Sequence, residues 1–306
     1  MSQSETKQVG FIIGRERDFP NAIMKRINEN YDDIRADLVK MGGTMQDTPL
    51  PYNVIIDRMS HEVPYYRSYV KYAAMRGCYL INNPFTWSID TKFLSGALVQ
   101  KLGYKSPRTV VLPNKDIEAE TVPDSFRNLE YPMDWQGIID YIGSPAIFKD
   151  VNSGGRRFAY RVNNVDELIQ RYDESGTRTM ILQQVLDTDN HVHCMVIGGE
   201  LTHMMSYSFD ERQYHDCTLD LDGPIAQQIT EMALTLTNLY GYDINLPEFV
   251  VQDGEVYVIN ATNPSPLINH ELMTDTQFDW IIDAVTDLAV SSIREPKEQR
   301  NPFDLD

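Results

Sequence analysis

Short apolar strands alternate with helices over the first 85 residues, and this alternation restricts how that part of the chain can fold. The apolar runs lie at residues 9–14, 52–57 and 78–81, and the segments with helical spacing at 20–30 and 63–77. A helix that follows a strand returns the chain to the same end of the sheet, so the next strand pairs in parallel. We therefore predict an α/β domain over residues 1–85.

Arginines follow two of these strands. Arg15 and Arg17 come after the first strand, and Arg58 comes after the second. Gly14 lacks the second and third glycines of a dinucleotide-binding fingerprint, so the turn does not predict a dinucleotide cofactor. We expect the three arginines to face a cleft at the strand ends.

Residues 145–162 form a different pattern, in which two short apolar runs flank a small polar loop. The loop contains Asn152, Ser153, Gly154 and Gly155, with Lys149 before it and Arg156 and Arg157 after it. The two runs predict an antiparallel hairpin, and glycines let backbone N–H groups approach an anion closely. A lysine beside such a loop fits a lid over nucleotide phosphates. An ordinary exposed hairpin with solvated cations explains the same residues.

A second lysine begins a predicted helix. Ser88 or Asp90 can cap this helix, which runs to about Leu102 and stops at Gly103. Lys92 then lies in the first turn, where the helix dipole favours acidic side chains. Its presence there indicates a role other than helix stability, or a side chain that simply extends into solvent.

The rest of the chain is predicted to contain further hairpins, strands and helices. Hairpins are expected around Gly198-Gly199 and Asp253-Gly254, because both dipeptides favour tight turns. Further strands are predicted at 106–113 and 179–186, and helices within 114–143 and at 165–174, 225–240 and 275–293.

Composition narrows the classes of partner. The chain has 27 basic and 45 acidic residues, a net charge of −18, which disfavours nucleic acid because phosphate backbones bind excess Lys and Arg. Its three cysteines do not suggest a disulfide framework. The polar first eight residues do not resemble a secretion signal, and no apolar run approaches the ~20 residues of a membrane helix. We expect a cytoplasmic protein without a membrane partner.

The order of the motifs is more specific than any one of them. Two lysines are followed by a strand-to-acidic-loop hinge at 182–189, a Gly-Gly hairpin, and two strands bearing Glu248 and Asn260, with Asn263 just beyond. This order resembles the ATP-grasp superfamily, most closely its RimK and glutathione-synthetase branch, over residues 85–293. The resemblance implies the ATP-grasp fold, of α/β and α+β class. Its parts would be a Rossmann-like pre-ATP-grasp domain at 1–85, a central subdomain at 86–186 and a C-terminal subdomain at 187–306. ATP would lie between the last two.

The resemblance also implies roles for individual residues. Lys92 and Lys149 would bind the nucleotide phosphates, with Ser153, Gly154 and Gly155 in the mobile loop above them. Residues that would surround the adenine and ribose are Gln183, Gln184, Val185, Leu186 and Asp189, and His191 would line the nucleotide cleft. Glu248, Asn260 and Asn263 would hold Mg²⁺ or Mn²⁺, for which hard oxygen ligands are suited.

Two positions depart from the family pattern. Asn260 stands where the family usually has an acidic metal ligand, so the site lacks one negative charge. His193 stands about where RimK-like enzymes place an arginine that stabilises the transferring phosphoryl group. Arg212, in the loop after the hairpin, is the first candidate to replace that arginine, and Arg156 is the next.

The implied activity is ATP-dependent ligation of a carboxylate to an amine, or to a thiol, through an acyl phosphate. The carboxylate would belong to an amino acid, a peptide or another small molecule, and Arg15, Arg17 and Arg58 would hold it. A homo-oligomer is compatible with the sequence. One alternative is an ATP-binding protein of the same fold without turnover, which Asn260 favours. Another is an oxidoreductase or hydrolase with zinc or iron bound at His191 and His193, which share one strand face.

Overall fold

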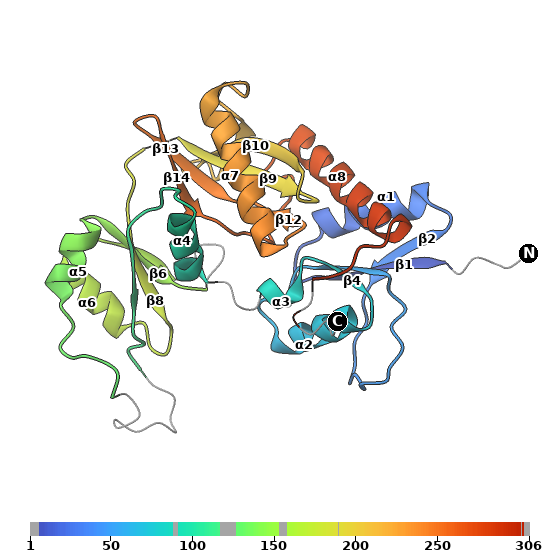
Figure 1. Cartoon of the computed structure of the whole chain (residues 1–306), viewed down its shortest axis with the longest axis horizontal. Helices are drawn as coiled ribbons and strands as arrows, with labels where there is room; N and C mark the ends of the chain where they lie inside the picture. The colour runs from blue at the N-terminus through green and yellow to red at the C-terminus, as the bar shows by residue number, and fades with distance from the viewer. Residues whose placement is uncertain are drawn as a thin grey trace, which may run out of the picture. The chain divides into compact units, whose positions relative to one another are not determined.

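The computed structural model describes residues 6–87, 91–116, 127–152, 158–188, 190–300 and 302. The chain divides into two compact units. Unit 1 comprises Met1–Asp90, His191–Pro247 and Thr262–Asp306, and unit 2 comprises Thr91–Asn190 and Glu248–Ala261. The predicted boundaries at 85 and 186 lie within five residues of two of these divisions, and the division into three domains stays a prediction. Figure 1 labels the elements along the chain.

The first part of unit 1 is the predicted parallel sheet. Its strands are β1 (Lys7–Ile12), β2 (Ile34–Leu38), β3 (Val54–Asp57) and β4 (Tyr79–Ile81), in the order β2-β1-β3-β4. All three neighbouring pairs are parallel. The prediction of an α/β sheet is confirmed, although β2 was not predicted.

Helices cover both faces of this sheet. On one face, α1 (Asp18–Asn30) packs with β1 and with the long helix α8 (Asp275–Arg294). On the other face, α2 (Pro64–Met75) packs against Ile12 and Ile55. Successive residues of a strand point to opposite faces, so the apolar sequence of β1 from Val9 to Ile12 follows from burial on both sides. The short helix α3 (Pro84–Trp87) follows β4.

The second part of unit 1 is antiparallel. The strands β9 (His191–Ile197) and β10 (Leu201–Ser208) form a hairpin, extended by β11 (Gln213–Asp216) beside β10 and β12 (Ile244–Asn245) beside β9. Gly198 and Gly199 both have positive φ, 67° and 76°, which L-residues with side chains rarely adopt. The predicted Gly-Gly turn is therefore confirmed. Helix α7 (Pro224–Tyr240) connects β11 to β12 along the chain.

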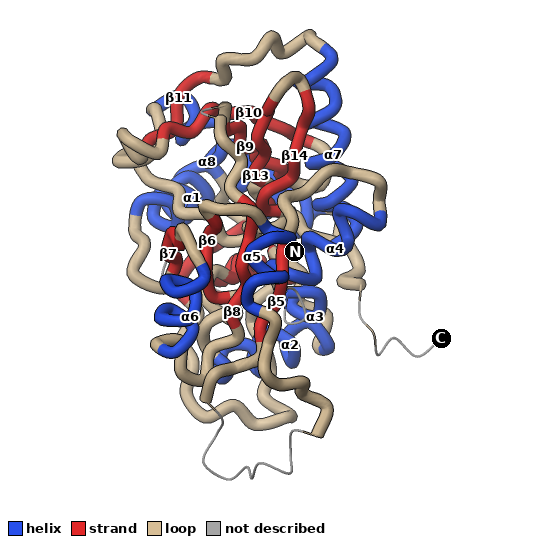
Figure 2. The backbone as a smooth tube through the Cα atoms, turned by 90° about the vertical axis from the view of Figure 1, so that its left-hand side faces the viewer, coloured by secondary structure: helices blue, strands red, loops and turns tan. Residues whose placement is uncertain are grey.

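Unit 2 contains a second antiparallel sheet. Its strands are β5 (Thr109–Leu112), β8 (Met180–Gln184), β6 (Ala146–Asp150) and β7 (Ala159–Val162), in the order β5-β8-β6-β7. The helices α5 (Trp135–Ile142) and α6 (Val165–Asp173) cover one face and enclose Phe148 and Leu182. Figures 1 and 2 both show these two helices beside β6 and β8. The predicted lysine hairpin is thus β6 and β7.

Unit 2 also contains α4 (Lys92–Lys101) and the hairpin of β13 (Glu248–Gln252) and β14 (Glu255–Asn260). Helix α4 packs against β14. The α/β and α+β fold class is therefore confirmed. Within the described residues, no helix is both long and apolar enough to cross a membrane.

The start of α4 differs from the prediction. The N-cap is Thr91, whose side chain accepts a hydrogen bond from the Leu94 N–H at 3.2 Å. The predicted caps Ser88 and Asp90 lie outside the described residues. Thr91 has extended backbone angles and a hydroxyl in reach of the third helical residue, which is what an N-cap requires.

Candidate functional site

The structure brings the start of α4 to the end of β6. The Lys92 N–H donates to the Val151 carbonyl at 3.1 Å, so the first residue of the helix is fastened to the chain two residues after Lys149. Thr91 caps the helix and leaves Lys92 as its first residue. The two lysines that sequence order had paired therefore belong to one local structure within unit 2.

Lys149 has a neutral hydrogen-bond partner. Its Nζ donates to Oε1 of Gln183 at 2.8 Å, and the Gln183 Nε2 donates in turn to the Thr109 hydroxyl at 3.2 Å. In the antiparallel register of β6 and β8, Gln183 is opposite Ile147, so Lys149 and Gln183 are diagonal neighbours on one face. The side chain of Gln183 thus binds the Lys149 ammonium, and the predicted place of the Gln183 backbone near adenine stays a prediction.

The electrostatic surroundings of Lys149 disfavour its charge. Burial, joined by the positive charge of Lys92, lowers the pKa of Lys149 to about 8, and Glu248 partly opposes this shift. A buried cation with a neutral partner and a like charge nearby is destabilised. An anion bound between Lys92 and Lys149 would remove that penalty, and triphosphate is such an anion.

Glu248 and Asn260 face each other across the β13–β14 hairpin. The strand register pairs them directly, with a register shift between Glu248 and Phe249. The Asn260 Nδ2 donates to Oε1 of Glu248 at 3.1 Å. The predicted proximity of these two residues is confirmed.

The donor set fits a divalent ion that arrives with a nucleotide. A carboxylate and an amide provide the hard oxygen atoms that Mg²⁺ prefers, and Mg²⁺ in such sites takes its other ligands from phosphates and water. No group of three or more His, Cys, Asp or Glu side chains in the described part of the chain could hold a metal ion.

The chain that follows β8 leaves the sheet near these groups. Gln184 exchanges two hydrogen bonds with the backbone of Arg108, through its own N–H at 2.9 Å and through its side-chain oxygen at 3.2 Å. Val185 and Leu186 are half-buried. The Thr188 hydroxyl donates to the Val251 carbonyl at 3.1 Å and fastens the segment to β13.

Some predicted residues lie outside the described part of the chain. These are Ser153, Gly154, Gly155, Arg156 and Arg157 of the predicted lid, and Asp189 of the predicted ribose contact. Their roles stay predictions.

The two histidines of β9 belong to an aromatic cluster in unit 1. His193 is buried, its Nδ1 lies 3.0 Å from the Tyr214 hydroxyl, and its ring stacks on Tyr207 with centroids 5.1 Å apart. The ring of His191 meets the edge of Phe209 at 4.3 Å. These contacts are those of a packed aromatic core, and the predicted nucleotide-facing roles stay untested.

The predicted arginines fall into two groups. Arg15, Arg17 and Arg212 are exposed, and Arg212 occupies the turn between β10 and β11. Arg58 is buried, with both Nε and Nη2 bound to Glu16 at 2.8 and 2.9 Å. Glu16 had no assigned role, and its pairing with a residue 42 positions later has no local sequence signal.

Asn263 is held by its backbone within unit 1. Its N–H donates to the Asn245 Oδ1 at 2.7 Å, and its carbonyl accepts from the Leu246 N–H at 3.1 Å. The role of its side chain as a metal ligand stays a prediction.

No sequence-family model matches the chain, and no curated protein sequence matches it. Solved structures do share its fold. A RimK-domain ATP-grasp protein from Sphaerobacter thermophilus has a TM-score of 0.66 at 14% identity, over 92% of this chain and 98% of that chain. A D-alanine–D-alanine ligase from Bacillus anthracis, complexed with ATP, has a TM-score of 0.67 at 12% identity, over 96% of this chain and all of that chain (100%).

A third similar structure is the ATP-grasp ligase PsnB, complexed with a minimal precursor, Mg and ADP. Its TM-score is 0.63 at 14% identity, over 95% of this chain and 99% of that chain. The chain therefore has the ATP-grasp fold, and the resemblance drawn from the order of its motifs is confirmed at the level of the fold.

Proposed function

We propose that this protein binds Mg²⁺·ATP and uses it to join a carboxylate to an amine. The observation that carries the proposal is Lys149, a buried cation next to Lys92 whose side chain donates to a neutral amide. Such a site gains most from an anionic ligand. The fold shared with ATP-grasp ligases supports ATP as that ligand.

The proposed ligation proceeds in two displacement steps. A substrate carboxylate oxygen attacks the γ-phosphorus of ATP, the bond to the β-phosphate oxygen breaks, and ADP leaves. The amine then attacks the acyl phosphate carbonyl, a C–N bond forms, and phosphate leaves with the amine proton transferred to solvent or a base. In both steps the protein positions the reactants and stabilises charge.

Residues of unit 2 supply that stabilisation. Lys92 and Lys149 would bind the phosphate oxygens, and Gln183 would keep the Lys149 ammonium oriented. Glu248 and Asn260 would hold Mg²⁺ together with phosphate oxygens, and the ion would neutralise charge on the triphosphate. The backbone of Gln184, Val185 and Leu186 would contact the adenine.

The carboxylate substrate is proposed to be an amino acid or a peptide. Structures with this fold include a D-alanine–D-alanine ligase and a ligase bound to a precursor peptide. Arg15 and Arg17 are exposed and would hold its carboxylate, and Arg212 would contact the transferring phosphoryl group.

A thermal-shift titration tests the nucleotide site. Saturating Mg²⁺·ATP should raise the Tm of the wild type, because a ligand that binds only the folded state stabilises it by mass action. Lys92→Ala and Lys149→Ala should each reduce that shift. Lys105→Ala is the matched control, since Lys105 belongs to the same unit but pairs with Glu255 at 2.7 Å on the surface. No shift in the wild type would contradict the proposal.

A second candidate is an ATP-binding protein without turnover. It is favoured by Asn260, whose amide donates to Glu248 where the family usually has a second carboxylate. Release of ADP that depends on an added amino acid or peptide separates the two candidates. A thermal shift with ATP but no such release across a panel of amino acids and peptides would favour the second.

A further inference from the structure

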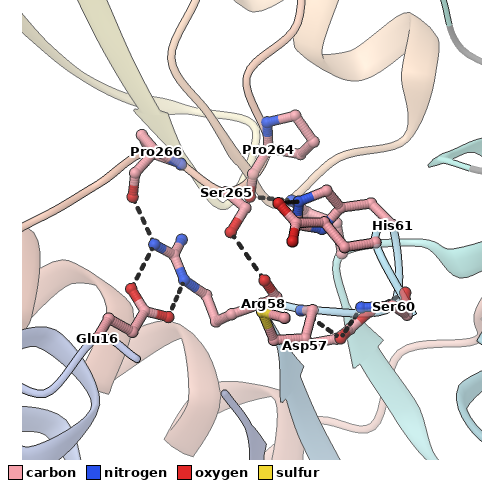
Figure 3. Close-up of polar contacts among 11 residues, drawn as sticks. Glu16, Asp57, Arg58, Ser60, His61, Pro264, Ser265 and Pro266 are labelled. Atoms are coloured by element: carbon pink, nitrogen blue, oxygen red, sulfur yellow. Dashed lines mark hydrogen bonds and ion pairs between the residues drawn. The ribbon is translucent and has the colours of Figure 1, made fainter. Parts of the chain in front are cut away.

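Within unit 1, residues 263–266 are each held by hydrogen bonds to other parts of the chain. We call Asn263, Pro264, Ser265 and Pro266 the closing segment. Asn245 and Leu246 hold the backbone of Asn263 at 2.7 and 3.1 Å, and Asn82 donates to the Pro264 carbonyl at 3.0 Å. The Ser265 hydroxyl donates to the Arg58 carbonyl at 3.3 Å, and the Arg58 Nη2 donates to the Pro266 carbonyl. Figure 3 shows the arginine reaching this carbonyl from the side of Glu16.

The side chain of Arg58 is also oriented by contacts outside the closing segment. Glu16 binds two of its nitrogens at 2.8 and 2.9 Å, and the guanidinium lies over the ring of Phe19 at 4.7 Å. Its side chain is 2% exposed, which leaves no surface for a substrate carboxylate. A buried ion pair contributes little net stability, because desolvation offsets the attraction. Stability alone therefore does not account for the pair.

Both polar atoms of the Asn82 side chain are likewise engaged in hydrogen bonds to the backbone. Its oxygen accepts from the N–H groups of Asp243 and Ile244, both at 2.7 Å. Its nitrogen donates to the carbonyls of Ile244 and Pro264 at 2.7 and 3.0 Å. One buried amide thus joins the end of β4 to β12 and to the closing segment, and its donors and acceptor leave no capacity for a ligand.

The place of these contacts in the sheet is informative. The connection from β1 runs to β2 on one side, and the connection from β3 runs to β4 on the other, so the direction reverses between β1 and β3. In open α/β sheets, ligands bind outside the carboxyl ends of strands at such a reversal. Glu16 and Arg58 follow these two strands, and the carbonyl of Pro266 is the group that Arg58 binds there.

We propose that Arg58, Asn82 and Asn245 form a clamp that positions the closing segment for metal-dependent nucleotide binding. Arg58 is a positioning residue and does not bind the substrate carboxylate. The closing segment begins three residues after Asn260, and its fixed backbone sets where the Asn263 side chain starts. The nucleotide part of this proposal rests on the proposed function, whereas the clamp itself does not.

Hydrogen exchange tests the clamp directly. The amides of Asn263 and Leu246 should be protected in the wild type, and Arg58→Met should make them exchange about tenfold faster, as expected from losing one buried charged hydrogen bond. The double variant Glu16→Leu/Arg58→Met removes the whole ion pair, so it leaves no unpaired buried carboxylate and should fold. It should show the same faster exchange. Arg294→Met is the control, because Arg294 pairs with Asp33 at 2.8 Å in the same unit, away from the closing segment.

Calorimetric titration tests the functional part. In the double variant, the Kd for Mg²⁺·ATP should rise about tenfold, while the Kd for ATP in EDTA should stay within twofold because the lysines are unchanged. A general loss of structure would weaken both, and would overturn the positioning role. If the wild type binds no ATP, the proposed function fails and the exchange data alone decide the clamp. Wild-type exchange rates at Asn263 and Leu246 in the double variant would overturn it.

Discussion

Two buried cations, one in each unit, are treated in opposite ways. Arg58 in unit 1 binds both oxygens of Glu16 at 2.8 and 2.9 Å. Lys149 in unit 2 donates to a neutral amide at 2.8 Å and has a like charge, Lys92, nearby. Burial and the charge of Lys92 lower the pKa of Lys149 to about 8.

The difference distinguishes a charge that is paired within the protein from a charge that is not. The charge of Arg58 is neutralised by the protein, so it serves the internal architecture. The charge of Lys149 is not neutralised by a partner of its own, and burying it costs free energy that only a ligand can recover. Perturbed lysines of this kind mark functional sites.

Replacing each cation by methionine should give effects of opposite sign on the ligand-free protein. Arg58→Met leaves Glu16, whose side chain is only 12% exposed, without its partner, and should lower the free energy of unfolding by about 3–5 kcal/mol. Lys149→Met replaces the lysine by a neutral side chain of similar length and so removes an uncompensated charge. This variant should leave the free energy of unfolding unchanged or raise it. Urea unfolding followed by circular dichroism measures both. Equal losses in the two variants would contradict the distinction drawn between the two cations.

The pH dependence of stability should differ in the same sense. The pKa of Lys149 in the folded state, about 8, is below its ordinary value of 10.5, so between these values the unfolded state binds more protons. Stability from this group therefore rises with pH from about 8 to 10.5, by on the order of 3 kcal/mol. Phosphate binding should restore the proton, so ATP affinity should fall as pH rises above 8. The difference between wild type and Lys149→Met, measured by unfolding at several pH values, isolates the group. Parallel curves would show that Lys149 does not titrate there.

Much of the architecture could be predicted because its causes are local. The Gly198-Gly199 turn and the long amphipathic helices α7 and α8 depend on residues close in sequence. Strands β11 and β12 were missed because they have four and two residues, too few to show a period. The N-cap of α4 was predicted at Ser88 or Asp90 and lies at Thr91, because all three side-chain types can cap a helix.

The candidate residues of the site could be named from the sequence, but the hydrogen-bond partners of its charged side chains could not. The order of Lys92, Lys149, Glu248 and Asn260 was sufficient to select them as candidates, and their roles stay predictions. The hydrogen bond between the Lys149 ammonium and Gln183 depends on the pairing of β6 with β8. The ion pair between Glu16 and Arg58 depends on the contact of two loops. Such pairings follow from tertiary structure, which a single sequence does not reveal.

Asp243 extends the comparison to a buried anion with a neutral partner. Burial raises its pKa to about 6, although the hydrogen bonds from Tyr79 at 2.9 Å act against the rise. Between pH 3.8 and 6 the folded state binds more protons, so stability from this group is present below pH 3.8 and is lost as pH rises through 6. The loss should be on the order of 2–3 kcal/mol. Asp243→Asn should abolish this slope in urea unfolding from pH 4 to 7. An unchanged slope in the variant would mean that another carboxyl produces it.

The smallest expected effect comes from adding a charge beside Glu248. Asn260→Asp places a second carboxylate next to Glu248, where the amide now donates at 3.1 Å. Without metal the two like charges should repel and lower the free energy of unfolding. With Mg²⁺·ATP, the added carboxylate should strengthen binding by on the order of 1–2 kcal/mol, as for a charge-assisted contact.

The matched variant is Asn263→Asp, the same chemical change three residues later. Calorimetric titration of both variants with Mg²⁺·ATP, and with ATP in EDTA, shows which position meets the metal. Tighter binding only at 260 would support the pairing with Glu248, and tighter binding only at 263 would move the metal to the closing segment. If neither changes the metal-dependent part, Glu248 is the sole described candidate to ligate the ion, and the charge at this end of the site comes from the nucleotide. Turnover that appears in Asn260→Asp but not in the wild type would identify the natural asparagine as the cause of a silent enzyme.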